Sequence, residues 1–67
     1  MTTVNKLEKA LTSAKGLAIE LKTFSLDTND QQAKQTFEQL SQTTEHIAQT
    51  LESRLNFAKS EEPQYRE

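Results

Sequence analysis

Hydrophobic residues recur at three- and four-residue spacing along two long segments, which predicts two amphipathic α-helices joined by a polar turn. The first segment, residues 3–25, carries an apolar stripe about 160° wide, broader than the seam that a simple helix pair needs. We therefore expect this helix to pack against more than one neighbour. The stripe consists of Val4, Leu7, Ala10, Leu11, Ala14, Leu17, Ala18, Leu21 and Phe24.

A second apolar seam runs along the same predicted helix, formed by Thr12, Gly16, Ile19, Thr23 and Leu26. Its small residues would let a neighbouring backbone approach, and its two aliphatic residues would supply buried surface. An exposed glycine inside a helix costs about 1 kcal/mol relative to alanine, so Gly16 favours a close helix contact. The alternative is that these are ordinary scattered surface hydrophobics. Because a helical hairpin uses one seam per helix, we expect the second seam to bind a partner.

The second segment, residues 30–60, shows the four-three repeat that is typical of coiled coils. Thr44 interrupts its apolar face, and a buried threonine can donate its hydroxyl to the carbonyl four residues earlier. The predicted face consists of Ala33, Phe37, Leu40, Thr44, Ile47, Leu51, Leu55 and Ala58.

Residues 26–29 are predicted to form the turn, with Thr28 or Asn29 as the cap of the second helix. The two helices would then measure about 34 Å and about 46 Å. In an antiparallel hairpin the last two turns of the longer helix would overhang, exposing Leu55 and Phe57. We expect another subunit to cover this overhang. Pro63 disfavours helix at the preceding residue, so residues 1–60 form the hairpin and residues 61–67 a flexible acidic tail.

The composition narrows the functional classes. The net charge is −2, and acidic and basic residues alternate along the chain. Nucleic-acid-binding proteins gather their basic residues on one face, so this class is disfavoured. No apolar run approaches the ~20 residues that span a bilayer, and the first residues lack the apolar core of a signal peptide. We therefore expect a soluble cytoplasmic protein without a transmembrane segment.

Catalytic and metal-binding patterns are not found in the sequence. The residue three positions before His46 is Thr43, so the Glu-x-x-His pair of helical metal sites is absent. The serine and threonine hydroxyls have no histidine or lysine base at a convincing spacing. We expect no enzymatic activity and no cofactor. A chain of this size has marginal stability alone, and without cysteines or a metal it is expected to gain stability by oligomerisation.

Several short segments resemble a family of short uncharacterised proteins from endospore-forming Firmicutes. The resemblance implies a domain of unknown function, with some relatives encoded near spore-membrane and germination genes, and therefore a setting in sporulation. Ser53 departs from the family, in which a proline is expected at that position. The similar segments are residues 12–16, 20–24, 30–34, 51–54 and the Glu-Glu-Pro-Gln-Tyr tail at 61–65.

These observations predict an all-α protein: an antiparallel two-helix hairpin that dimerises into a four-helix bundle. The first hypothesis for its function is self-association through the helix faces. The interface residues that we predict are Thr12, Gly16, Ile19, Thr23, Leu26, Leu55 and Phe57. The second hypothesis is an adaptor that binds another protein, such as a membrane protein of the developing spore. A nucleic-acid-binding hairpin dimer is the third, and the acidic balance argues against it.

Overall fold

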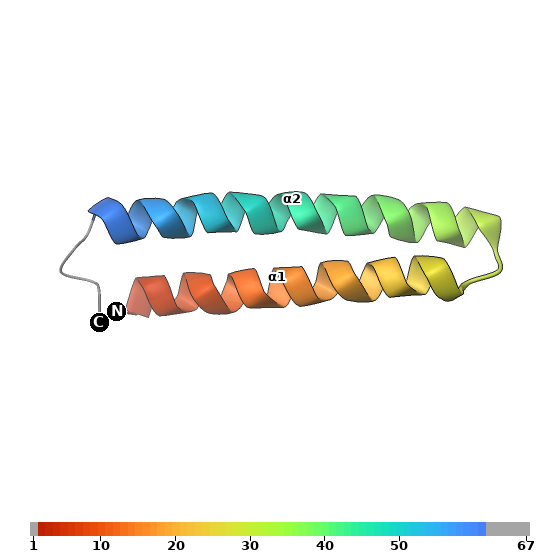
Figure 1. The fold of residues 1–67 in the computed structure, drawn as a ribbon, viewed down its shortest axis with the longest axis horizontal. Helices are drawn as coiled ribbons and strands as arrows, with labels where there is room; N and C mark the ends of the chain where they lie inside the picture. The colour runs from red at the N-terminus through yellow and green to blue at the C-terminus, as the bar shows by residue number, and fades with distance from the viewer. Residues whose placement is uncertain (1, 62–67) are drawn as a thin grey trace.

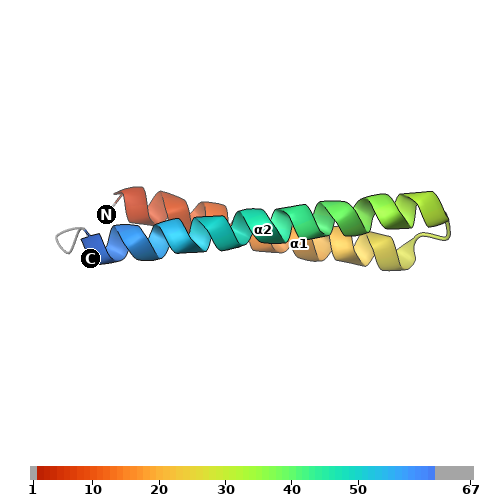
Figure 2. The ribbon, with the colours of Figure 1, turned by 90° about the horizontal axis from the view of Figure 1, so that it is seen from above.

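The computed structural model describes residues 2–61, which form two α-helices packed side by side in opposite directions (Figure 1). Helix α1 spans Thr2–Asp27 and helix α2 spans Gln31–Glu61. The start of α1 lies beside the end of α2, and the helices cross at a shallow angle (Figures 1 and 2). The predicted all-α fold of two packed helices is confirmed. Of the tail predicted at residues 61–67, Glu61 is the last residue of α2, and residues 62–67 lie outside the described residues.

The turn, residues 28–30, begins two residues later and ends one residue later than predicted, because α1 continues to Asp27 and α2 begins at Gln31. The cap of α2 is Asp30, whose Oδ1 accepts hydrogen bonds from the backbone N–H groups of Gln32 at 3.0 Å and Ala33 at 3.4 Å. The expectation that Thr28 or Asn29 caps α2 is wrong. Instead, Thr28 Oγ1 accepts a hydrogen bond from the Asp30 N–H at 3.2 Å and so fixes the turn itself.

Burial between the helices recurs every seven residues on each of them. This interval keeps one row of side chains directed at the neighbouring helix. On α1 the buried row is Val4, Leu11, Ala18 and Ser25, and on α2 it is Ser41, Ala48 and Leu55. The face predicted for α2 is therefore rotated in the structure: Ser41 and Ala48 are buried, while their neighbours Leu40 and Ile47 are about half exposed.

The middle and the turn end of the seam are built from small side chains, several of them polar. Ser25 is completely buried and donates its hydroxyl to the Lys22 carbonyl at 2.7 Å. Thr44 donates to the Leu40 carbonyl at 2.8 Å, which confirms the hydrogen bond expected for a buried threonine at this position. Within residues 2–61 every buried side-chain nitrogen or oxygen has a hydrogen-bond partner. Small, satisfied polar residues let the helix backbones approach closely without a desolvation penalty.

Larger apolar residues gather at the open end of the hairpin. Val4, Leu11 and Leu55 form the buried cluster there with Ala14 and Ala48. Leu55 is only 6% exposed, so the prediction that it lies in an overhang is wrong. The later turn places Leu55 beside Val4 of α1, although α2, with 31 residues against 26, still extends beyond the start of α1 (Figure 1).

The hairpin is a single layer of two helices. Its Cα atoms extend over 51 × 14 × 11 Å, with a radius of gyration of 15.2 Å. A compact chain of this length would have a radius of gyration of about 11 Å. Within residues 2–61, both flanks of the hairpin therefore lack the second layer against which domains normally bury their helices.

Candidate interaction surface

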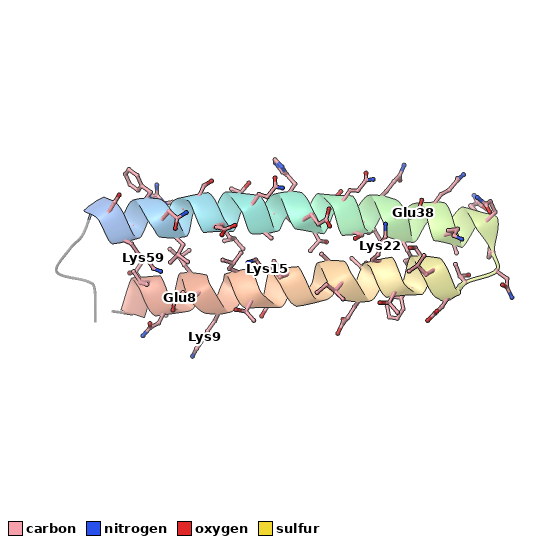
Figure 3. The ribbon with its side chains drawn as sticks, viewed as in Figure 1. Glu8, Lys9, Lys15, Lys22, Glu38 and Lys59 are labelled. Atoms are coloured by element: carbon pink, nitrogen blue, oxygen red, sulfur yellow. The ribbon has the colours of Figure 1, made fainter. Side chains whose placement is uncertain are left out.

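One flank of the hairpin is charged. It carries Glu8 from α1, which forms an ion pair with Lys59 of α2 at 3.5 Å, and both side chains are about half exposed. Figure 3 shows these two residues directed toward one another across the helices. Further along the same flank the lysines of α1 lie across the groove from the glutamates of α2. The charged flank consists of Glu8, Lys15, Lys22, Glu38, Glu45, Glu52 and Lys59.

Two shallow grooves on the charged flank show that these rows face the same side. A groove of about 460 Å³ is lined by Lys22 of α1 and by Glu38 and Glu45 of α2. The neighbouring groove of about 430 Å³ is lined by Lys15 and by Glu45 and Glu52. On each helix, the row of residues on the other side of the buried seam therefore lies on the opposite flank of the hairpin.

That opposite flank is apolar. Leu17 and Phe24 of α1 and Leu40 and Ile47 of α2 are each about half exposed, at seven-residue spacing along their helices. Partly buried side chains lie between them and the core. We call this surface the apolar face, and it consists of Leu7, Ala10, Leu17, Leu21, Phe24, Ala33, Phe37, Leu40, Ile47 and Leu51.

An aromatic pair marks the turn end of the apolar face. The rings of Phe24 and Phe37 lie with their centroids 5.6 Å apart at an interplanar angle of 56°. This tilted arrangement is favourable for aromatic pairs. The two rings line an open hollow of about 370 Å³ together with Asp27 and Thr28. The pair ties α1 to α2 and still presents ring surface to the outside.

The seam predicted on α1 lies elsewhere. Ile19 is 67% exposed and Leu26 is 65% exposed, on the side of α1 that borders the charged flank. A Cβ added to Gly16 would meet nothing within 4 Å, so no contact within the chain requires a glycine. Thr23 donates its hydroxyl to the Ile19 carbonyl at 3.0 Å. Thr12 is also exposed, so all five residues are accessible in the single chain.

The two interface residues predicted on α2 lie in different surroundings. Leu55 belongs to the core of its own hairpin. Phe57 is half exposed, and the Arg54 guanidinium lies 5.0 Å from its ring centroid. This stacking contact covers one side of the ring.

Leu17 belongs to the wide stripe predicted on α1, and Leu40 and Ile47 to the face predicted on α2, but all three are about half exposed. The signal that separates them is that the next residue, Ala18, Ser41 or Ala48, is small and belongs to a buried seven-residue row of its helix. Each small residue directly follows a large aliphatic one, and burial of the small residue turns the large one outward.

The described residues do not build a recognisable chemical site. Within residues 2–61 no group of three or more histidine, cysteine, aspartate or glutamate side chains is placed to hold a metal ion. In the same range neither helix is apolar enough over a sufficient length to cross a bilayer.

The fold and its surface define a small helical hairpin with one charged and one apolar flank. The chain belongs to the family described as "Protein of unknown function (DUF1657)", which matches residues 7–55. This range covers most of both helices and the whole turn between them. Comparisons with curated proteins and with solved structures found no match for this chain.

Proposed function

We propose that this chain is a non-enzymatic interaction protein that self-associates through its apolar face, so that two hairpins form a four-helix bundle. The observation that carries the proposal is the asymmetry of the hairpin. Leu17, Phe24, Leu40 and Ile47 are about half exposed on one flank, whereas the other flank is charged. A large apolar patch on a water-soluble surface is typical of a protein–protein interaction site.

The small core supports this proposal. Six apolar residues are buried in the single hairpin, and three of them are Ala14, Ala18 and Ala48, which bury little surface. Covering the remaining half of a leucine, isoleucine or phenylalanine side chain contributes about 1 kcal/mol. A second hairpin on the apolar face would add several such contributions from each copy and provide the second layer that domains normally contain.

The dimensions of the apolar face suit a stable dimer. Its residues extend over roughly 30 Å along helices about 10 Å wide each, on the order of 600 Å² per copy. A standard protein–protein interface buries about 800 Å² on each partner. The charged flank would stay in water, where it keeps the assembly soluble.

The adaptor hypothesis is favoured by a different observation. Ile19 and Leu26 are the most exposed large apolar residues of the described chain, and they lie outside the apolar face. In the proposed dimer they would remain accessible and could contact another protein. If the chain acts only as an adaptor, the purified protein is a monomer that melts without cooperativity and gains helix when the partner is added.

The test is sedimentation equilibrium over a hundredfold concentration range, with circular dichroism on the same samples. We expect a helical dimer for the natural chain and a monomer for the double variant Leu40→Gln/Ile47→Gln. The matched control is Ile19→Gln/Leu26→Gln, which removes two exposed aliphatic side chains from the other side and should remain dimeric. A natural chain that stays monomeric at all concentrations would overturn the proposal. If only the control variant became monomeric, the interface would instead be assigned to the seam predicted on α1.

We propose the developing spore as the cellular setting, on the basis of the resemblance described above. A fluorescent fusion expressed from the natural promoter tests this setting. Signal confined to cells that form spores would support it, and equal signal throughout vegetative growth would contradict it.

A further inference from the structure

We infer that the second copy lies on the apolar face in the opposite direction, so that the turn of each hairpin lies beside the open end of the other. Helix α1 would then pack against α1 of the second copy, and α2 against its α2. This inference rests on the proposed self-association and adds its geometry. The two-fold axis would lie between the two apolar faces, perpendicular to the helices, at the level of Leu17.

The contacts within one hairpin fix which residues lie at the same level. Ser41 contacts the Ala18 carbonyl, and Phe24 contacts Phe37. Leu17 therefore lies level with the stretch of α2 midway between Leu40 and Ile47. The exposed rows on the two helices therefore have their centres at the same level. A two-fold axis that runs between the two faces requires this alignment.

Side-chain sizes match about this axis. Ala10 and Phe24 each lie seven residues from Leu17, so the smallest residue of the row on α1 would face the largest one of the second copy. The two copies of Leu17 would meet at the axis. On α2, Leu40 would face Ile47 of the second copy, and Ala33 would face Arg54, which continues the same seven-residue row. Large residues would therefore meet small or equal ones along the interface, as close packing requires.

Charges at the outer edge of the face also match. Lys6 and Asp27 are exposed and border the row of Ala10, Leu17 and Phe24 at its two ends. They lie eleven and ten residues from Leu17, so the axis would bring Lys6 of each copy to Asp27 of the other. Opposite charges would meet twice at the rim, where polar residues usually surround an apolar interface.

The alternative dimer places both turns at the same end, with α1 against α2 of the second copy. In that arrangement Lys6 would face Phe57, and Asp27 would face Thr36. Neither contact pairs opposite charges. The positions of Lys6 and Asp27 therefore favour the arrangement with the turns at opposite ends.

A spin-label distance distinguishes the two arrangements. The described residues contain no cysteine, and the sequence as a whole has none, so a single nitroxide can be attached at Asn29→Cys in the exposed turn. Turns at opposite ends predict a distance of about 40 Å between the two labels, from a rise of 1.5 Å per residue on either side of Leu17. Turns at the same end predict less than about 20 Å. Double electron–electron resonance on the dimer measures this distance.

The outcomes separate this inference from the proposed function. A distance near 40 Å supports both. A short distance overturns the arrangement and leaves self-association intact, whereas a monomer in sedimentation overturns both.

A charge exchange tests the rim contact independently. Lys6→Glu should weaken dimerisation about tenfold, because two exposed pairs per dimer become repulsive. The double variant Lys6→Glu/Asp27→Lys should restore the dissociation constant to within about threefold of the natural chain. Lys9→Glu is the matched control, because Lys9 is directed away from α2 and lies outside the rim (Figure 3). An effect of Lys6→Glu no larger than that of the control, or a failure of the double variant to restore binding, would overturn the contact.

Discussion

Ser41 donates its hydroxyl to the carbonyl oxygen of Ala18 at 3.0 Å, which joins the middle of α2 to the middle of α1. Both residues are buried. The Ala18 carbonyl lies inside a helix, so the hydroxyl bond adds to the hydrogen bonding of the backbone. A single small polar side chain thus fixes the register of the helix pair and turns Leu40 toward the apolar face.

Ser41→Leu should destabilise the hairpin, although it would lengthen the apolar stripe of α2. The larger side chain cannot enter a closely packed seam without moving the helices apart, which costs about 1–3 kcal/mol. Urea unfolding followed by circular dichroism measures this change at one fixed protein concentration, because the proposed association would also contribute to stability. Ser53→Leu, at an exposed position of α2, is the control and should change the unfolding free energy by less than about 0.5 kcal/mol. Equal effects of the two substitutions would contradict the observed register.

Truncation of Leu55 and truncation of Phe57 should lower the unfolding free energy by different amounts, although both residues were predicted to lie in an overhang. Leu55 is buried among Val4 and Leu11, so Leu55→Ala should cost about 2–3 kcal/mol of unfolding free energy. Phe57 is half exposed and mainly contacts Arg54, so Phe57→Ala should cost less than about 1 kcal/mol. Thermal unfolding of the two variants at equal concentration checks the difference. A greater loss for Phe57→Ala would mean that a partner covers this ring.

Asp30→Ala should destabilise α2 by about 1 kcal/mol, because two backbone N–H groups lose their acceptor. Asn29→Ala is the matched control, because Asn29 lies in the same turn and was one of the two residues predicted as the cap. We expect the control to change the unfolding free energy by no more than about 0.3 kcal/mol. Amide hydrogen exchange at Gln32 and Ala33 would localise the effect, with faster exchange in Asp30→Ala only.

The helices were predictable because their three- and four-residue apolar spacing and a single turn segment leave little choice of fold. The turn was harder to place. Residues 27–30 read Asp-Thr-Asn-Asp, and all four side chains can form capping or turn hydrogen bonds. With Asp30 as the cap, the turn starts two residues and ends one residue later than predicted. The later turn places Leu55 beside Val4, so Leu55 does not lie in the overhang from which its contact with a partner had been inferred.

The exposed apolar flank was not predictable from apolar spacing alone. Leu40 and Ser41 lie next to each other, as do Ile47 and Ala48, and a hydrophobicity pattern favours the larger residue of each pair for the core. The structure buries the smaller one, because two helices that approach closely have no room for a leucine row on both sides. The wide stripe of α1 did predict a second neighbour, but the sequence could not show which of its rows that neighbour would contact.

A substitution at Gly16 tests which of two surfaces forms the proposed dimer interface, the apolar face or the seam predicted on α1. In the hairpin a Cβ at this position has open space around it, and Gly16 lies inside a helix. Gly16→Ala should therefore raise the unfolding free energy by about 1 kcal/mol through helix propensity alone. If α1 instead used Gly16 for close contact with a second copy, the added methyl group would push the two backbones apart and weaken the dimer. Thermal unfolding and sedimentation equilibrium of Gly16→Ala, beside Ser53→Ala as an exposed helical control, measure both quantities. Higher stability with an unchanged dissociation constant is the result that we expect, and a weaker dimer would assign the interface to the seam of Thr12, Gly16 and Ile19.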